Sequence, residues 1–163
     1  MITPEQVEST VTGAFSDTPH PEERIVSNPS HWEAAEIQND FKGKHWRDII
    51  DPTFLREHRT LYYFSPGGFR YYLPAYLIGL LRFPTEAVEW SDEVLVALYP
   101  PAHSGNTWLP RWDERMKVLD PVQKRAVRLF LEYLLATEPE LWRTTDPPGN
   151  ELELALANYW SQF

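Results

Sequence analysis

The sequence predicts an all-α protein, and three observations support this fold class. Proline repeatedly follows a Ser, Thr or Asp, a pairing that favours helix starts because the side chain caps the first turn and proline fits its first position. Apolar residues recur at helical spacing after these starts. The most β-favouring run, residues 60–64, has no partner run across a hairpin turn. We therefore predict a compact single-domain bundle of about seven helices over residues 1–163, with residues 1–29 as a more loosely attached N-terminal segment.

Each predicted helix has its own start signal. Two serines, Ser30 and Ser91, cap a helix without a following proline, and Asp92 and Glu93 after Ser91 suit the positive end of the helix dipole. Residues 100–110 are rich in turn-forming residues and predict a long loop. In chain order, the predicted starts are Thr3-Pro4, Ser30, Asp51-Pro52, Ser65-Pro66, Ser91, Asp120-Pro121 and Asp146-Pro147.

The segment 66–83 is predicted to be the central helix. Its uncharged part, residues 71–81, is much shorter than the roughly 20 residues that a membrane span needs. A helix that is apolar nearly all round is buried in a core. Pro74 lacks an N–H and its ring pushes against the carbonyl of Arg70, so we expect this helix to kink, or to break and restart, at that point.

The kink suggests candidate ligand-binding residues. A carbonyl without its usual partner and several tyrosine hydroxyls need hydrogen-bond partners if they are buried. We therefore name Arg70, Tyr72 and Tyr76 as candidates for lining a small-molecule pocket at Pro74. The alternative, that this region is ordinary packed core, stays open, because apolar helical stripes usually are core.

The charge distribution suggests a different kind of site. The formal net charge is −9, which on average repels nucleic acid and anionic membranes, so we expect neither as a partner. No Lys or Arg occurs between Arg82 and Arg111, whereas four acids cluster there. Such a face steers and binds a basic protein, or it serves only solubility. The candidate partner-binding residues are Glu86, Glu89, Asp92 and Glu93.

Catalytic and metal-binding signatures do not occur in the sequence. The chain has no Cys, which excludes disulfides and thiolate chemistry, and it contains neither an HExxH nor a GxSxG motif. We therefore predict no catalytic residues, no cofactor and no metal, and we do not predict an enzyme. The N-terminus lacks the pattern of a secretory signal, so we expect a cytoplasmic protein, with a homo-oligomer left open.

Several motifs carry a family resemblance. They are the SPGGFRYYLPAYL element at 65–77, FKGKHW at 41–46, PVQKRAVRLFLEYL at 121–134 and ALANYW at 155–160. From about Ser30 to Phe163 the chain resembles a family of small uncharacterised bacterial proteins, known only as a domain of unknown function. The resemblance implies no site residues. We expect a soluble, acidic bacterial protein-interaction module, with an immunity-type role left open; the alternative is a small-molecule-binding protein or enzyme with a tyrosine-lined pocket at Pro74.

Overall fold

The structure is a computed structural model that describes residues 1–101, 109–142 and 149–163. Helices form the fold throughout these ranges. These ranges hold no β-strand, only an isolated antiparallel bridge between Val26 and Phe64. The α-helices are α1 (Pro4–Phe15), α2 (Trp32–Phe41), α3 (Pro52–Glu57), α4 (Pro66–Arg82), α5 (Pro84–Ala87), α6 (Ser91–Leu98), α7 (Leu109–Val118), α8 (Pro121–Thr137), α9 (Pro139–Trp142) and α10 (Glu151–Asn158). Three short 3-10 helices complete the set: η1 (Trp46–Ile49), η2 (Leu61–Tyr63) and η3 (Trp160–Gln162).

The all-α prediction is confirmed, but the predicted number of helices is too low. The described part of the chain holds ten α-helices, and the three that the sequence analysis did not predict are α5, α7 and α9. Two of these are single turns of four residues, which leave little periodicity to detect. The third, α7, begins inside the segment that was predicted to be a loop.

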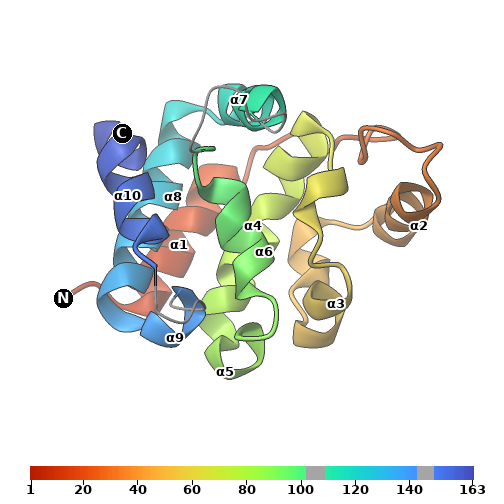
Figure 1. Cartoon of the computed structure of the whole chain (residues 1–163). Coiled ribbons are helices and arrows are strands. Elements are labelled where there is room, and N and C mark those ends of the chain that lie inside the picture. The colour runs from red at the N-terminus through yellow and green to blue at the C-terminus, as the bar shows by residue number, and fades with distance from the viewer. Residues whose placement is uncertain (102–108, 143–148) are drawn as a thin grey trace.

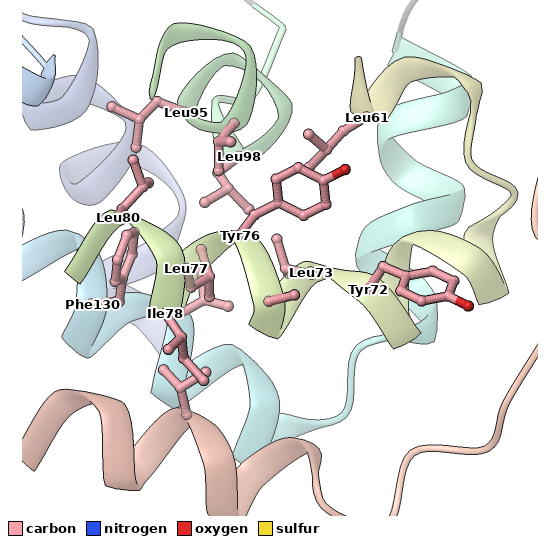
Figure 2. Packing of buried hydrophobic residues seen from close by; sticks show 14 of the residues in the cluster. Leu61, Tyr72, Leu73, Tyr76, Leu77, Ile78, Leu80, Leu95, Leu98 and Phe130 are labelled. Carbon is pink, nitrogen blue, oxygen red and sulfur yellow. The ribbon is translucent and has the colours of Figure 1, made fainter. Parts of the chain in front are cut away.

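Helix α4 is the centre of the core. Every residue from Gly68 to Leu80 is buried, with the single exception of Arg70. Figure 2 shows α6 and α1 on opposite sides of α4, with Leu80 directed toward Leu95 of α6 and Ile78 toward α1. One continuous helix runs past Pro74, so the alternative that the chain breaks and restarts there is wrong. No helix in the described ranges is long and apolar enough to cross a membrane.

The N-terminal segment contributes directly to this core. In Figure 1, α1 lies beside α8 and α4, and its side chains Val7, Val11 and Phe15 are fully buried. The chain after α1 then reaches the start of α4, where the backbone N–H of Ser65 donates to the Ile25 carbonyl at 2.9 Å. These contacts join residues 1–29 to the central helix, and the looser attachment of this segment stays a prediction.

Two glycines allow close packing around α4. A Cβ at position 68 would lie 2.1 Å from the Ile25 carbonyl oxygen, so only glycine permits the backbone to approach this closely. At position 79 a Cβ would lie 2.4 Å from a methyl group of Leu55 and 3.0 Å from the Trp90 ring. Helix α4 is therefore fitted to its neighbours at both ends.

Most of the predicted start signals act as helix caps. The side chains of Thr3, Asp51, Ser65 and Asp120 each accept a hydrogen bond from the backbone N–H three residues ahead, as an N-cap does. The two serine caps are wrong by one position: α2 and α6 have His31 and Trp90 as their N-caps, without a side-chain hydrogen bond. The start predicted at Asp146 lies outside the described residues.

Candidate functional site

One face of α7 forms the base of a pocket between distant parts of the chain. Arg111 and Arg115 are neighbours on this helix at i, i+4, and Trp112 and Arg115 at i, i+3. The pocket has a volume of about 420 Å³, within the range of small-molecule sites. It is lined by Thr60, Leu61, Tyr62, Glu93, Val96, Ala97, Tyr99, Pro100, Pro101, Arg111, Trp112 and Arg115.

Arg115 is a buried cation with only part of its hydrogen-bonding capacity used. Its residue exposure is 5%, and its Nη2 donates to the carbonyl oxygens of Leu61, Tyr62 and Phe64 at 2.8, 2.6 and 3.0 Å. Its guanidinium lies 5.0 Å from the centre of the Phe69 ring. The Nη2 contacts hold the C-terminal end of η2 against α7, which is a structural role.

The remaining atoms of Arg115 set its electrostatics. Its Nε is buried and has no hydrogen-bond partner, and no carboxylate in the described ranges forms an ion pair with this side chain. Burial, followed by the nearby positive charge of Arg111, lowers the pKa of Arg115 to about 10. The side chain therefore stays charged at neutral pH without a counter-ion from the described part of the chain.

Two neighbours on α7 extend this donor-rich surface. The Nε1 of Trp112 is also buried without a hydrogen-bond partner, and its ring meets Tyr159 edge-to-face with 4.7 Å between ring centroids. Arg111 lies over the Tyr62 ring at 4.3 Å, and its Nη1 donates to the Tyr62 carbonyl at 3.3 Å. The α7 side of the pocket thus carries positive charge, and two of its residues hold buried N–H donors without a partner.

This arrangement suits a ligand group that only accepts hydrogen bonds. A buried donor without a partner costs about 1–3 kcal/mol, a cost that a bound acceptor removes. An anionic acceptor additionally pairs with the buried guanidinium, for which charge-assisted hydrogen bonds are the strong ones. The rest of the lining, from α6 and residues 99–101, is mostly apolar and suits a hydrocarbon portion.

A smaller pocket adjoins this one. It has a volume of about 190 Å³ and shares the side chains of Tyr62 and Arg111 with the larger pocket. His31 is stacked on Tyr63 at its edge, with 5.5 Å between the ring centroids. Its lining residues are Ser27, Asn28, His31, Tyr62, Tyr63 and Arg111.

The predicted ligand residues on α4 lie elsewhere, and their polar groups have partners within the protein. The Tyr72 hydroxyl lies 3.0 and 2.9 Å from the carbonyl oxygens of Phe41 and Lys44, and the Tyr76 hydroxyl donates to the carbonyl of His58. Arg70 donates to Gln123 Oε1 at 2.9 Å and to Asp120 Oδ2 at 3.4 Å. None of the three lines either pocket described above.

The predicted acidic residues lie on α5, on α6 and between them, and two of them form ion pairs. Arg56 Nη1 lies 3.7 Å from Glu89 Oε2, and Arg59 Nε lies 2.9 Å from Glu93 Oε1. Glu86 and Asp92 are exposed, and Glu93 belongs to the lining of the larger pocket. The acidic face is therefore partly neutralised by the protein's own arginines.

In the described ranges, no group of three or more His, Asp or Glu side chains is placed to hold a metal ion.

The sequence analysis missed the pocket residues Arg111, Trp112 and Arg115. A signal was available, since Trp112, Met116 and Leu119 recur at i, i+4 and i+7, the spacing of a helical face.

The fold and the site together define an all-α protein with a cationic, partly apolar pocket. The chain belongs to the DUF6714 family, a family of unknown function, whose pattern matches residues 26–163. This confirms the resemblance to a domain of unknown function. No curated protein and no solved structure matches the chain.

Proposed function

We propose that this protein is a binding module for a small organic anion and that the pocket on α7 is its site. The acidic group of the ligand accepts hydrogen bonds from Arg115 Nε and Trp112 Nε1, close to the charge of Arg111. Its apolar portion lies against Val96 and Tyr99. One observation supports this proposal above all: Trp112 and Arg115 both line this pocket, each carries a buried N–H donor without a partner, and Arg115 is in addition a buried cation.

Binding is favoured over catalysis by the chemistry of the lining. General acid–base or nucleophilic catalysis needs a group whose pKa is matched to that task. Burial, followed by the negative charges of Glu151 and Asp92, raises the pKa of Tyr99 above its usual range, so its hydroxyl stays protonated at neutral pH. Arg115 likewise stays protonated at neutral pH. We therefore assign the pocket recognition and no bond-making step.

The test compares acids with neutral molecules of the same shape. Titration calorimetry at pH 7 would use 3-phenylpropionate against 3-phenylpropanol, and phenyl phosphate against phenol. We expect at least one anion to bind about tenfold more tightly than its neutral counterpart, as one charge-assisted hydrogen bond implies. Equal binding of both members of each pair, or no binding by any of them, would overturn the proposal.

Point variants locate this binding. Trp112→Phe removes one donor but keeps an aromatic ring, and Arg111→Gln removes one charge; each should weaken the anion about five- to tenfold. Arg56→Gln and Trp32→Phe are matched controls, because both residues lie outside the pocket lining. These two variants should bind the anion as tightly as the natural protein does. Loss of binding in the controls alone would contradict the assignment.

A second candidate function is the interaction with a basic protein expected from the sequence. Two exposed apolar side chains favour it: Val88 is 47% and Val96 is 65% exposed, close to the exposed acids Glu86 and Asp92. Charge on such a face accelerates association while apolar groups hold the complex. Under this second proposal, the protein is a bacterial, cytoplasmic interaction module of the immunity type. Affinity purification from the native host at low and high salt tests it, and the absence of any salt-sensitive basic partner would contradict it.

A further inference from the structure

The larger pocket carries both signs of charge. Arg111 and Arg115 come from α7, whereas the carboxylate of Glu93 comes from the first turn of α6. All three residues line the same cavity, and the apolar Val96 and Ala97 lie one turn further along α6. A simple anion would pair with the arginines but would also face the negative charge of Glu93.

Glu93 retains capacity for a ligand. Its ion pair with Arg59 joins the arginine Nε to Oε1 at 2.9 Å, and a carboxylate accepts several hydrogen bonds, so Glu93 can pair with a ligand ammonium group as well. The two side chains of this pair are 41% and 46% exposed, and the pair is therefore weak and open to rearrangement. A ligand ammonium at Glu93 would remove the repulsion between that carboxylate and the bound anion.

The apolar lining indicates what the two charges are attached to. Tyr62, Tyr99 and Trp112 supply three aromatic side chains, which favour edge-to-face contact with an aromatic ring. A ligand that matches every part of this lining has a carboxylate, an ammonium group and an aromatic portion. Resting on the proposed function, we infer that the pocket binds a free α-amino acid with an aromatic side chain.

Three ligands that share a phenylethyl unit test this inference. L-phenylalanine carries both charges, 3-phenylpropionate lacks the ammonium group, and phenethylamine lacks the carboxylate. Calorimetry at pH 7 and low salt should show L-phenylalanine binding about two- to fivefold more tightly than 3-phenylpropionate, the range expected for one partly exposed ion pair. Phenethylamine should bind more weakly than both. Glycyl-L-phenylalanine, whose ammonium group is displaced, should bind no better than 3-phenylpropionate.

The variant Glu93→Gln provides the decisive comparison. It should abolish the preference for L-phenylalanine over 3-phenylpropionate and leave the affinity for 3-phenylpropionate unchanged or slightly higher. Glu132→Gln is the matched control: Glu132 pairs with Arg128 at 2.7 Å, is 44% exposed and does not line the pocket, so its loss should leave the preference intact. Unchanged thermal unfolding of both variants would show that they fold alike.

The possible failures are distinguishable. Equal binding of L-phenylalanine and 3-phenylpropionate, or a preference that survives Glu93→Gln, would overturn the amino-acid inference while leaving the anion site in place. Equal binding of glycyl-L-phenylalanine and L-phenylalanine would overturn the assignment to a free amino acid. If neither L-phenylalanine nor 3-phenylpropionate binds, this inference is overturned, and the comparison of phenyl phosphate with phenol then decides the proposed anion site.

Discussion

Helices α4 and α7 differ in whether their buried polar groups have hydrogen-bond partners. On α4, the hydroxyls of Tyr72 and Tyr76 are deeply buried, yet each has a backbone carbonyl within hydrogen-bond distance. On α7, Arg115 Nε and Trp112 Nε1 are buried without any partner. Buried polar groups normally have hydrogen-bond partners. The α4 region therefore has the polar contacts of an ordinary core, whereas the α7 region has the unpaired donors expected of a ligand-free binding site.

This contrast shows that the most conspicuous sequence motif, on α4, is not where the candidate binding site lies. The aromatic stretch around Pro74 is conspicuous because a central helix needs apolar residues all round, and its polar atoms complete the core. The α7 segment is short and rich in charge, and its pocket becomes visible only when η2 and α6 are placed against it. Unsatisfied donors indicate a site here only where their residues also line a pocket, since Trp90 Nε1 and Ser91 Oγ are likewise buried without a partner and line neither pocket.

The largest expected effect comes from opening the satisfied region. Tyr72 is fully buried and its ring stacks on Phe64 with 5.6 Å between centroids, so Tyr72→Ala should lower the free energy of unfolding by about 3–5 kcal/mol. Urea denaturation followed by circular dichroism measures this loss. Trp32→Ala, at a residue 66% exposed, is the control and should change stability by less than about 0.5 kcal/mol. Similar losses in both variants would contradict the description of this core.

Alkaline pH should affect the two regions with opposite sign. Burial raises the pKa of Tyr72 and of Tyr76, so above pH 10 the unfolded chain loses these protons first and stability falls, by about 1.4 kcal/mol per pH unit for each tyrosine. The lowered pKa of Arg115 acts the other way: above about pH 10 the folded state releases a proton that the unfolded state keeps, which favours folding.

Denaturation at pH 9 and pH 11 measures the tyrosine contribution. In a Tyr72→Phe/Tyr76→Phe double variant, the loss of stability between these two pH values should be smaller than in the natural protein by about 3 kcal/mol. An identical loss in both proteins would show that these hydroxyls do not titrate differently in the folded and unfolded states.

The smallest effect sharpens the comparison most directly. Tyr76→Phe deletes a hydroxyl that donates to the His58 carbonyl and should cost about 1 kcal/mol or more. Trp112→Phe deletes a donor that has no partner, and should change stability by less than about 0.5 kcal/mol or even raise it. Paired thermal and urea unfolding compares them, and a larger loss for Trp112→Phe than for Tyr76→Phe would contradict this prediction.

The predictable part of the fold rests on local chemistry. A cap acts within one turn, so Thr3, Asp51, Ser65 and Asp120 could be identified as helix starts from sequence alone. Ser30 failed because its hydroxyl donates to Asn28 Oδ1 instead of capping α2. The start of α7 was not predicted because its first residues lie within 100–110, a segment rich in turn-forming residues, and its helical spacing of apolar residues begins only after that segment.

The site was not predictable in the same way. Its lining comes from three stretches, residues 60–62, 93–101 and 111–115, which tertiary packing alone brings together. Whether a donor such as Arg115 Nε has a partner is likewise a property of the folded chain. Of the residues expected to be functional, Glu93 lines the pocket, although it was chosen for its place in an acidic cluster.

The uneven burial of the tryptophans gives this protein an internal optical signal. Of those whose side chains the structure describes, Trp46, Trp90, Trp142 and Trp160 are buried, Trp32 is exposed, and Trp112 alone lines the larger pocket. A ligand that contacts Trp112 changes the polarity and quenching around that indole while leaving the core indoles in place. Replacing Trp32 with phenylalanine removes the emission of the solvent-exposed ring. Intrinsic fluorescence of that variant then reports occupancy of the pocket without any attached label.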